Sequence, residues 1–125
     1  PQNKFVANFI GDANVVKAEI LNKQSNSYDL KIAEMKIKVQ SDKELGETVS
    51  VALRPEKISI NKDKKENSIH ATVNNASFVG NSYQYILNSN AGKLFVISRE
   101  TNDIFKVGEE VFLSINDKEV KILND

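Results

Sequence analysis

The stretch Gly46-Glu-Thr-Val-Ser-Val-Ala-Leu-Arg-Pro-Glu-Lys-Ile-Ser-Ile60 contains the pattern that decides the fold of this chain. Apolar residues occupy every second position from Val49 to Leu53. The alternation stops at Arg54-Pro55-Glu56 and resumes at Ile58. A period of two is typical of half-buried β-strands, so the stretch predicts two strands joined by a corner.

A similar stretch, Gly108-Glu-Glu-Val-Phe-Leu-Ser-Ile-Asn-Asp-Lys-Glu-Val-Lys-Ile122, lies near the end of the chain, with Gly108 aligned to Gly46. The apolar phase is the same in both copies. The match fails at the corner, where Asn116-Asp117-Lys118 aligns with Arg54-Pro55-Glu56. We therefore predict two related β units, with a rigid corner in the first and an ordinary polar turn in the second.

The composition excludes several classes of protein. A chain of 125 residues fits one domain, or two small lobes that share a core. Cysteine is absent, which excludes disulfides, thiolate metal sites and cysteine nucleophiles. The 17 basic and 17 acidic residues balance, so no overall field attracts nucleic acid or anionic lipid. No apolar run approaches the roughly 18 residues that a membrane-spanning helix needs. Because the chain starts at Pro1 without methionine, we expect a fragment of a longer protein.

Alternating segments along the rest of the chain predict an all-β fold. One exception is residues 3–10, where Phe5 and Phe9 share an apolar stripe that predicts a short N-terminal helix. This helix packs either on its own domain or forms the end of a connection from an upstream domain. The polar residues 61–67 are the expected seam between the two units. A phase slip at Ala33-Glu34 requires a bulge or a tight turn. The expected strands are residues 16–20, 28–32, 35–39, 49–53, 58–60, 69–73, 83–87, 94–98, 111–115 and 120–122.

The number and spacing of these strands favour one closed architecture. A small Greek-key barrel of the OB type leaves no exposed edge, and we predict this fold. Periodicity alone does not separate such a barrel from a small sandwich.

The sequence contains no recognisable catalytic constellation. The single histidine, His70, falls on the outward phase of its strand and has no partners at metal-ligand spacing. Glu109 and Glu110 are adjacent on a strand start, which is typical of a solvated turn. Lys93 is followed by Leu94 rather than Ser or Thr, so the nearby glycine belongs to a hairpin and not to a phosphate loop. We therefore predict no catalytic, cofactor-binding or metal-binding residues in this fragment.

Nucleic-acid binding is a possible function of an OB barrel, because aromatic side chains on its strands can stack on bases. Here the lysines are scattered and are offset by acidic residues, so the basic groove that such binding needs is missing. We expect the strand aromatics to serve core and interface packing, and we expect no nucleic-acid partner. These residues are Phe78, Tyr83, Tyr85, Phe95 and Phe112.

The corner Arg54-Pro55-Glu56 is the most distinctive polar element. Pro55 fixes its own φ angle and favours extended backbone at Arg54, so the corner is rigid. Two interpretations remain open. The corner forms a surface ion pair, or it is a docking point where Arg54 makes directed hydrogen bonds to another domain or subunit.

Three motifs together resemble a known family. They are Phe5-Val-Ala-Asn-Phe-Ile-Gly-Asp-Ala-Asn14, Val51-Ala-Leu-Arg-Pro-Glu56 and Phe78-Val-Gly-Asn81. In this order they are similar to the C-terminal TOBE (transport-associated OB) region of ABC-importer ATP-binding subunits. The spermidine/putrescine importers are the subgroup with the strongest likeness.

This resemblance implies a division of the chain. Residues 1–11 would be a helical linker from an absent ATPase domain. Residues 12–125 would form one TOBE domain of two intertwined units, 12–60 and 68–125. The residues that match the family motifs, and that we name as candidate contacts to another domain or subunit, are Arg54, Pro55, Glu56, Phe5 and Phe9.

The resemblance also implies a function. The fragment would be an accessory regulatory and dimerisation domain that does no catalysis, since it lacks the Walker A, Walker B and signature sequences. ATP and Mg²⁺ would bind in the parent protein's ATPase domain. The partners would be that domain, a second copy of the subunit and, indirectly, the membrane permeases, at the cytoplasmic face of the cell membrane. The alternatives are a small-ligand sensor that binds oxyanions through Arg54 or lysine clusters, and a nucleic-acid-binding OB module.

Overall fold

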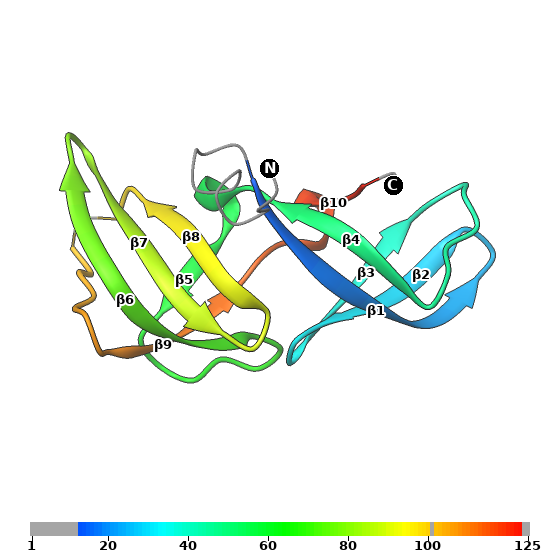
Figure 1. Cartoon of the computed structure of the whole chain (residues 1–125), viewed down its shortest axis with the longest axis horizontal. Helices are drawn as coiled ribbons and strands as arrows, with labels where there is room; N and C mark the ends of the chain where they lie inside the picture. The colour runs from blue at the N-terminus through cyan, green and yellow to red at the C-terminus, as the bar shows by residue number, and fades with distance from the viewer. Residues whose placement is uncertain (1–12, 101, 124–125) are drawn as a thin grey trace.

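The computed structural model describes residues 13–100 and 102–123, and this part of the chain is almost entirely β (Figure 1). The predicted all-β, OB-like class is confirmed. The predicted helix over residues 3–10 lies outside the described residues. The described part contains no helix of the length and apolarity needed to cross a bilayer. The elements are β1 (Asn14–Gln24), β2 (Ser27–Ile32), β3 (Met35–Gln40), β4 (Thr48–Leu53), η1 (Pro55–Lys57), β5 (Ser59–Asn61), β6 (Ile69–Val79), β7 (Ser82–Ser89), β8 (Gly92–Ser98), β9 (Glu110–Ser114), η2 (Asp117–Glu119) and β10 (Val120–Ile122).

The strands form two curled five-stranded sheets with the orders β10-β4-β1-β2-β3 and β5-β9-β6-β7-β8. In each sheet a meander of three strands is followed by a fourth strand that returns to pair with the first. The fifth strand comes from the other half of the chain. β5 pairs with β9, and β10 pairs with β4 (Figure 1). The two halves therefore exchange their last strands.

The two corners that carry the exchanged strands have the same backbone. Arg54 has φ −73° and ψ 134°, and Asn116 has φ −70° and ψ 138°. A short 3₁₀ turn follows each of these residues, η1 in the first half and η2 in the second. The second corner is a polar turn, as predicted, but its backbone repeats that of the first corner and is not a simpler one. Both corners pass a strand from one sheet into the other.

The corners differ in the side chains that hold them. In the first, Pro55 fixes φ at the start of η1. In the second, the Asn116 side chain accepts a hydrogen bond from Lys118 N at 3.0 Å. An asparagine cap, at the position that aligns with Arg54, therefore stabilises the second corner in place of the proline of the first.

Local irregularities explain the phase of the strands. Ala33 adopts φ 52° in a two-residue turn between Ile32 and Met35, which are cross-strand partners. The phase slip predicted at Ala33-Glu34 is therefore a tight turn. Both long strands also contain a bulge at matching places, after Ile20 in β1 and after Val73 in β6.

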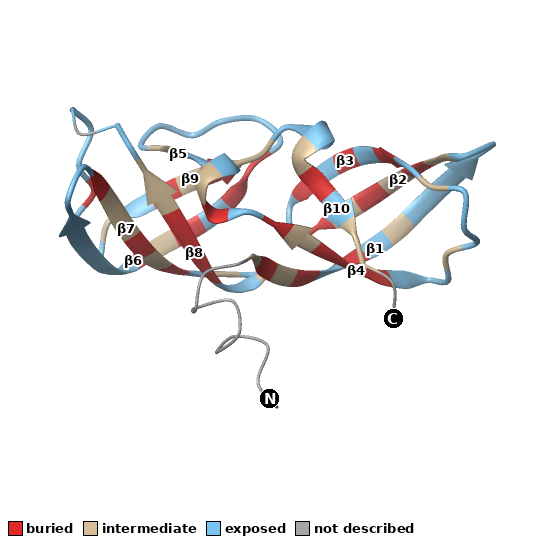
Figure 2. Cartoon of the chain, turned by 90° about the horizontal axis from the view of Figure 1, so that it is seen from above, coloured by how far each residue is buried: buried red, intermediate tan, exposed pale blue. Residues whose placement is uncertain are grey.

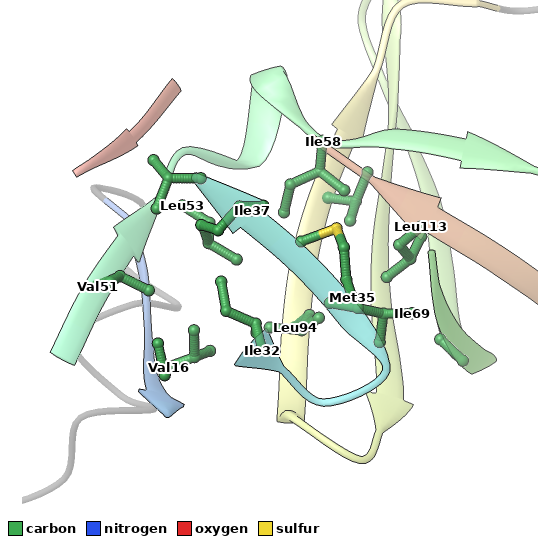
Figure 3. Close-up of a cluster of buried hydrophobic side chains, with 14 of the residues drawn as sticks. Val16, Ile32, Met35, Ile37, Val51, Leu53, Ile58, Ile69, Leu94 and Leu113 are labelled. Carbon is green, nitrogen blue, oxygen red and sulfur yellow. The ribbon is translucent and has the colours of Figure 1, made fainter. Parts of the chain in front are cut away.

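The core runs through both sheets without a break. Buried and less buried residues alternate along much of β1, β2, β3 and the first part of β6, which produces the banding along the ribbons in Figure 2. At the junction of the two sheets, Met35 and Leu53 meet Leu94 and Leu113, which belong to the second sheet (Figure 3). Each such side chain contributes roughly 1.5–3 kcal/mol when fully buried. The two lobes are therefore joined by shared apolar packing.

Candidate functional site

The first corner combines a buried and an exposed part. Pro55 is buried, and η1 packs against β8. Arg54 Nη2 lies 2.9 Å from Glu56 Oε2, and the two side chains are 60% and 28% exposed. The surface that the corner offers is thus the guanidinium of Arg54, oriented by the carboxylate of Glu56.

Of the five predicted contact residues, the structure brings together Arg54, Pro55 and Glu56. Phe5 and Phe9 lie outside the described residues. Because the Arg54–Glu56 ion pair is on the surface, its own contribution to stability is about 0–1 kcal/mol.

A shallow hollow lies beside each corner, between the 3₁₀ turn and the edge strand of the opposite sheet. The two hollows are equivalent in backbone but not in charge. The charged residues beside the first corner are mainly acidic, and they are Glu56, Arg99, Glu100 and Asp103. Those beside the second are mainly basic, and they are Lys38, Asp42, Lys43, Asp117 and Lys118. A charged ligand or partner would therefore distinguish the two corners.

Two buried tyrosines at equivalent places tie down the long loops. The hydroxyl of Tyr28 donates to Lys43 O at 3.0 Å, and the hydroxyl of Tyr85 accepts from Phe105 N–H at 3.2 Å. Burial raises the pKa of Tyr85, and the hydrogen bond from Phe105 opposes that rise. Each tyrosine thereby connects the core to the loop that precedes the returning strand.

We expect Tyr85→Phe to lower the free energy of unfolding by about 1 kcal/mol, because one buried hydrogen bond is lost. The pKa of Tyr85 is raised in the folded state, so its contribution to stability is present below the unfolded pKa of about 10 and is lost as pH rises beyond it. The variant should therefore lose less stability than the wild type between neutral and alkaline pH. Urea unfolding of both proteins, at neutral pH and again at alkaline pH, measures this difference in stability. An identical alkaline loss in both proteins would contradict the assignment.

Asn14 forms a buried bridge between the two sheets. It is 1% exposed and lies at the start of β1. Its side chain accepts from Phe95 N–H at 2.7 Å, and its Nδ2 donates to Phe95 O at 2.9 Å and to Leu53 O at 3.0 Å. The amide thus pairs with the edge strand β8 in the same way as a peptide group.

Asn67 makes a comparable bridge in the opposite direction, just before β6. It accepts from Lys36 N–H at 2.7 Å and donates to Lys36 O at 2.8 Å, on the edge strand β3. Sequence reasoning missed both bridges. The sequence does contain a sign of them. Residues 16–20 and 69–73 have the same apolar pattern, and an asparagine, Asn14 or Asn67, stands two residues before each.

The remaining polar groups that the sequence suggested are surface features. His70 is exposed, as predicted, and its Nε2 lies 2.8 Å from Glu110 Oε1. Its ring stacks on Phe112 with 5.2 Å between centroids. Glu109 accepts from Lys106 N–H in the loop before β9. Within residues 13–100 and 102–123, no cluster of three potential metal ligands occurs.

Together, the exchanged strands, the paired corners and the continuous core define a double β domain of OB type. The chain belongs to the TOBE domain family, which it matches over residues 51–123. This confirms the family inferred from the three sequence motifs.

Two curated relatives cover nearly the whole chain. "Fe(3+) ions import ATP-binding protein FbpC" of Fusobacterium nucleatum is 25% identical over 100% of this chain and 34% of its own length. "Spermidine/putrescine import ATP-binding protein PotA" of Thermotoga maritima is 25% identical over 93% of this chain and 35% of its own length. The chain therefore spans about a third of the length of these relatives.

The fold is also similar to a solved structure, that of the cytoplasmic molybdate-binding protein ModG with molybdate bound. The TM-score is 0.69 at 14% identity, over 87% of this chain and 94% of ModG. At this identity the likeness concerns the fold alone.

Proposed function

We propose that this chain is the accessory regulatory and dimerisation domain of an ABC-importer ATP-binding subunit. The observation that carries the proposal is the match to the TOBE family together with near-complete coverage of the chain by two import ATP-binding proteins. ATP and Mg²⁺ would bind in the remaining two-thirds of the longer protein. The partners would be that ATPase domain, a second copy of the subunit and the membrane permeases, at the cytoplasmic face of the membrane.

The transported substrate is a narrower question. The sequence motifs favour polyamines, and the PotA relative is named for spermidine and putrescine. The FbpC relative, at the same identity, is named for Fe³⁺. Polyamine transport therefore stays a prediction, with iron import as its competitor.

Within the parent protein we propose that residues 1–11 connect the ATPase domain to one TOBE domain over residues 12–125. In this arrangement Arg54 and Glu56, with Phe5 and Phe9, contact the ATPase domain or the second subunit. The exposed guanidinium beside the rigid Pro55 supports this role, because a pre-oriented arginine loses little conformational entropy on forming directed hydrogen bonds.

The coding sequence tests the proposal directly. We expect an ATPase domain with Walker A, Walker B and signature sequences to be encoded in frame immediately upstream of Pro1. An open reading frame that starts near Pro1 would exclude the proposed function.

A small-ligand sensor is the second candidate, since the fold is shared with a molybdate-binding protein. Thermal shift with molybdate, sulfate, phosphate and spermidine tests it. A ligand at a hundred times its dissociation constant stabilises the folded state by about 2.7 kcal/mol. The absence of a shift with all four compounds would exclude this role for them.

We expect Arg54→Ala to lower the free energy of unfolding by less than about 1 kcal/mol, because the ion pair with Glu56 is exposed. In the longer protein the same change should weaken dimerisation or its coupling to ATP hydrolysis. Lys118→Ala, which removes a charge from the second corner, is the control. It should leave dimerisation and its coupling to ATP hydrolysis unchanged. Unfolding of the isolated domain by Arg54→Ala would show that the corner is structural and would reject the docking role.

A further inference from the structure

The hairpin of β6 and β7 is the one long part of this chain without charge. Residues 71–92 contain no Asp, Glu, Lys, Arg or His, although charged residues make up 27% of the sequence. Within this run, residues 74–79 of β6 are all exposed and form the far end of the second lobe (Figure 2). A charge-free, exposed segment in an otherwise charged surface is typical of an interaction site.

One edge of this exposed segment is open. β9 pairs with β6 only from Ile69 to Thr72, and the loop before β9 continues the contact as far as Val73. Beyond Val73, β6 pairs with β7 alone among the described strands. Within residues 13–100 and 102–123, no strand bonds to the backbone groups on the other side of residues 75–79, and these groups can pair with a further strand.

Apolar side chains gather around this open edge. A row of four aromatic rings leads outward from the core. The distances between successive ring centroids are 5.7 Å from Phe105 to Tyr85, 6.0 Å from Tyr85 to Tyr83 and 4.9 Å from Tyr83 to Phe78. The row starts at the buried Phe105 and Tyr85 and ends at Phe78, which is 56% exposed. Four of the five exposed large apolar residues in the described chain lie on this hairpin or on the loop that reaches it, namely Phe78, Val79, Ile104 and Val107.

The first lobe provides an internal comparison. Beyond its bulge the β1–β2 hairpin has three residue pairs, whereas the β6–β7 hairpin has five. At the end of the β1–β2 hairpin, Lys23 forms an ion pair with Glu44, and its Nζ lies 5.5 Å from the ring centroid of Tyr28. Tyr28 occupies the place of Tyr85. The end of this hairpin thus carries an ion pair in the first lobe, and is longer, uncharged and open in the second.

We propose that residues 75–79 of β6 form the contact between two copies of this chain, paired edge to edge as antiparallel strands. Antiparallel pairing about a two-fold axis places the same segment opposite itself, so like charges would face each other if any were present. This segment has none. Three of the four outermost strands carry lysine, which opposes such pairing, and the fourth, β5, has only three residues. The lysines are Lys36 and Lys38 in β3, Lys93 in β8 and Lys121 in β10.

This inference rests on the proposed function, in which two copies of the subunit act together, and it names one surface that they use, separate from the Arg54 corner. In the dimer the two five-stranded sheets would join through β6, and Phe78 and Val79 would be covered by the partner copy. The backbone hydrogen bonds would fix the register, and the apolar side chains would supply the burial.

Sedimentation velocity over a range of concentrations tests the contact. We expect the wild-type chain to form a dimer whose dissociation constant rises roughly tenfold or more in Phe78→Lys and in Ser77→Lys, because like charges then meet across the two-fold axis. Leu21→Lys is the matched control, since Leu21 is 45% exposed at the corresponding bulge of the first lobe. It should leave the dissociation constant unchanged. At concentrations where every protein is monomeric, Ser77→Lys and Leu21→Lys should unfold at the wild-type thermal midpoint, because each replaces an exposed residue. Phe78→Lys also loses the ring contact with Tyr83 and should unfold slightly earlier.

Amide hydrogen exchange locates the contact. The amides of residues 75–79 that point away from β7 should become protected as the concentration of the wild-type chain rises, and should stay unprotected in Phe78→Lys. The amides that face β7 already bond within the hairpin. A monomer at every concentration, a dimer that both lysine variants leave intact, or protection confined to other residues would overturn the inference. So would protection of residues 75–79 only within a monomeric longer protein, because the ATPase domain would then be the occupant.

The two proposals fail separately. If the upstream coding sequence encodes an ATPase domain but the edge contact is absent, only this inference is wrong. If the edge contact forms and no ATPase domain is encoded, the proposed function is wrong and the interaction surface stands.

Discussion

Asn14→Ala is expected to lower the free energy of unfolding by about 2–3 kcal/mol. The substitution removes three hydrogen bonds and leaves Phe95 N–H, Phe95 O and Leu53 O without their partner in the interior. An unsatisfied buried polar group costs about 1–3 kcal/mol, and the small side chain of alanine cannot restore any of these bonds. Urea denaturation followed by circular dichroism measures the change.

Asn67→Gly is the comparison variant, because Asn67 has φ 55°, a conformation that glycine adopts without strain. The bridge to Lys36 is exposed, so water can replace the lost hydrogen bonds and the expected loss is below about 1 kcal/mol. Equal losses in the two variants would mean that the burial of Asn14 is not what makes its bridge important.

Leu53→Ala is expected to cost about 2–5 kcal/mol, since Leu53 is 1% exposed at the junction of the two sheets. The Leu53→Ala variant should still unfold in a single thermal transition, because the side chains that surround Leu53 come from both sheets. Leu113→Ala, the corresponding truncation from the second sheet, should behave alike. Differential scanning calorimetry measures both the loss of stability and the number of transitions.

Two separate thermal transitions in either variant would contradict this prediction. They would mean that each lobe is stable alone and that the shared packing between Met35, Leu53, Leu94 and Leu113 contributes little. A loss below about 1 kcal/mol in both variants would contradict it as well, because it would show that the junction can collapse around the missing side chain.

The local elements could be predicted from the sequence because their signal is local. Alternation with a period of two located the strands, and the phase slip at Ala33-Glu34 located a tight turn. The comparison of residues 46–60 with 108–122 identified both corners. It gave the wrong expectation for the backbone of the second corner, because an asparagine cap and a proline can stabilise the same turn.

The pairing of the strands could not be predicted in the same way. Alternation states which side of a strand is buried but not which neighbour it has, so the exchange of β5 and β10 left no sign in the pattern. The open edge of β6 could not be predicted either, because alternation does not show where a strand lacks a neighbour. Tyr28, Tyr85 and Asn14 were read as ordinary strand residues, since their hydrogen bonds join segments that are far apart in the sequence. Phe5 and Phe9 stay predictions.

The exchanged strands have a consequence for the two halves of the chain. Because β5 lies in the second sheet and β10 in the first, a single unit would be left with a strand that has no sheet of its own to join. Two separate copies of such a unit could complete each other only as a reciprocally swapped pair. Residues 62–68 connect the two units covalently, which replaces a bimolecular encounter by a high effective concentration. The chain thus has the form of a reciprocally swapped pair whose two copies are joined in one polypeptide.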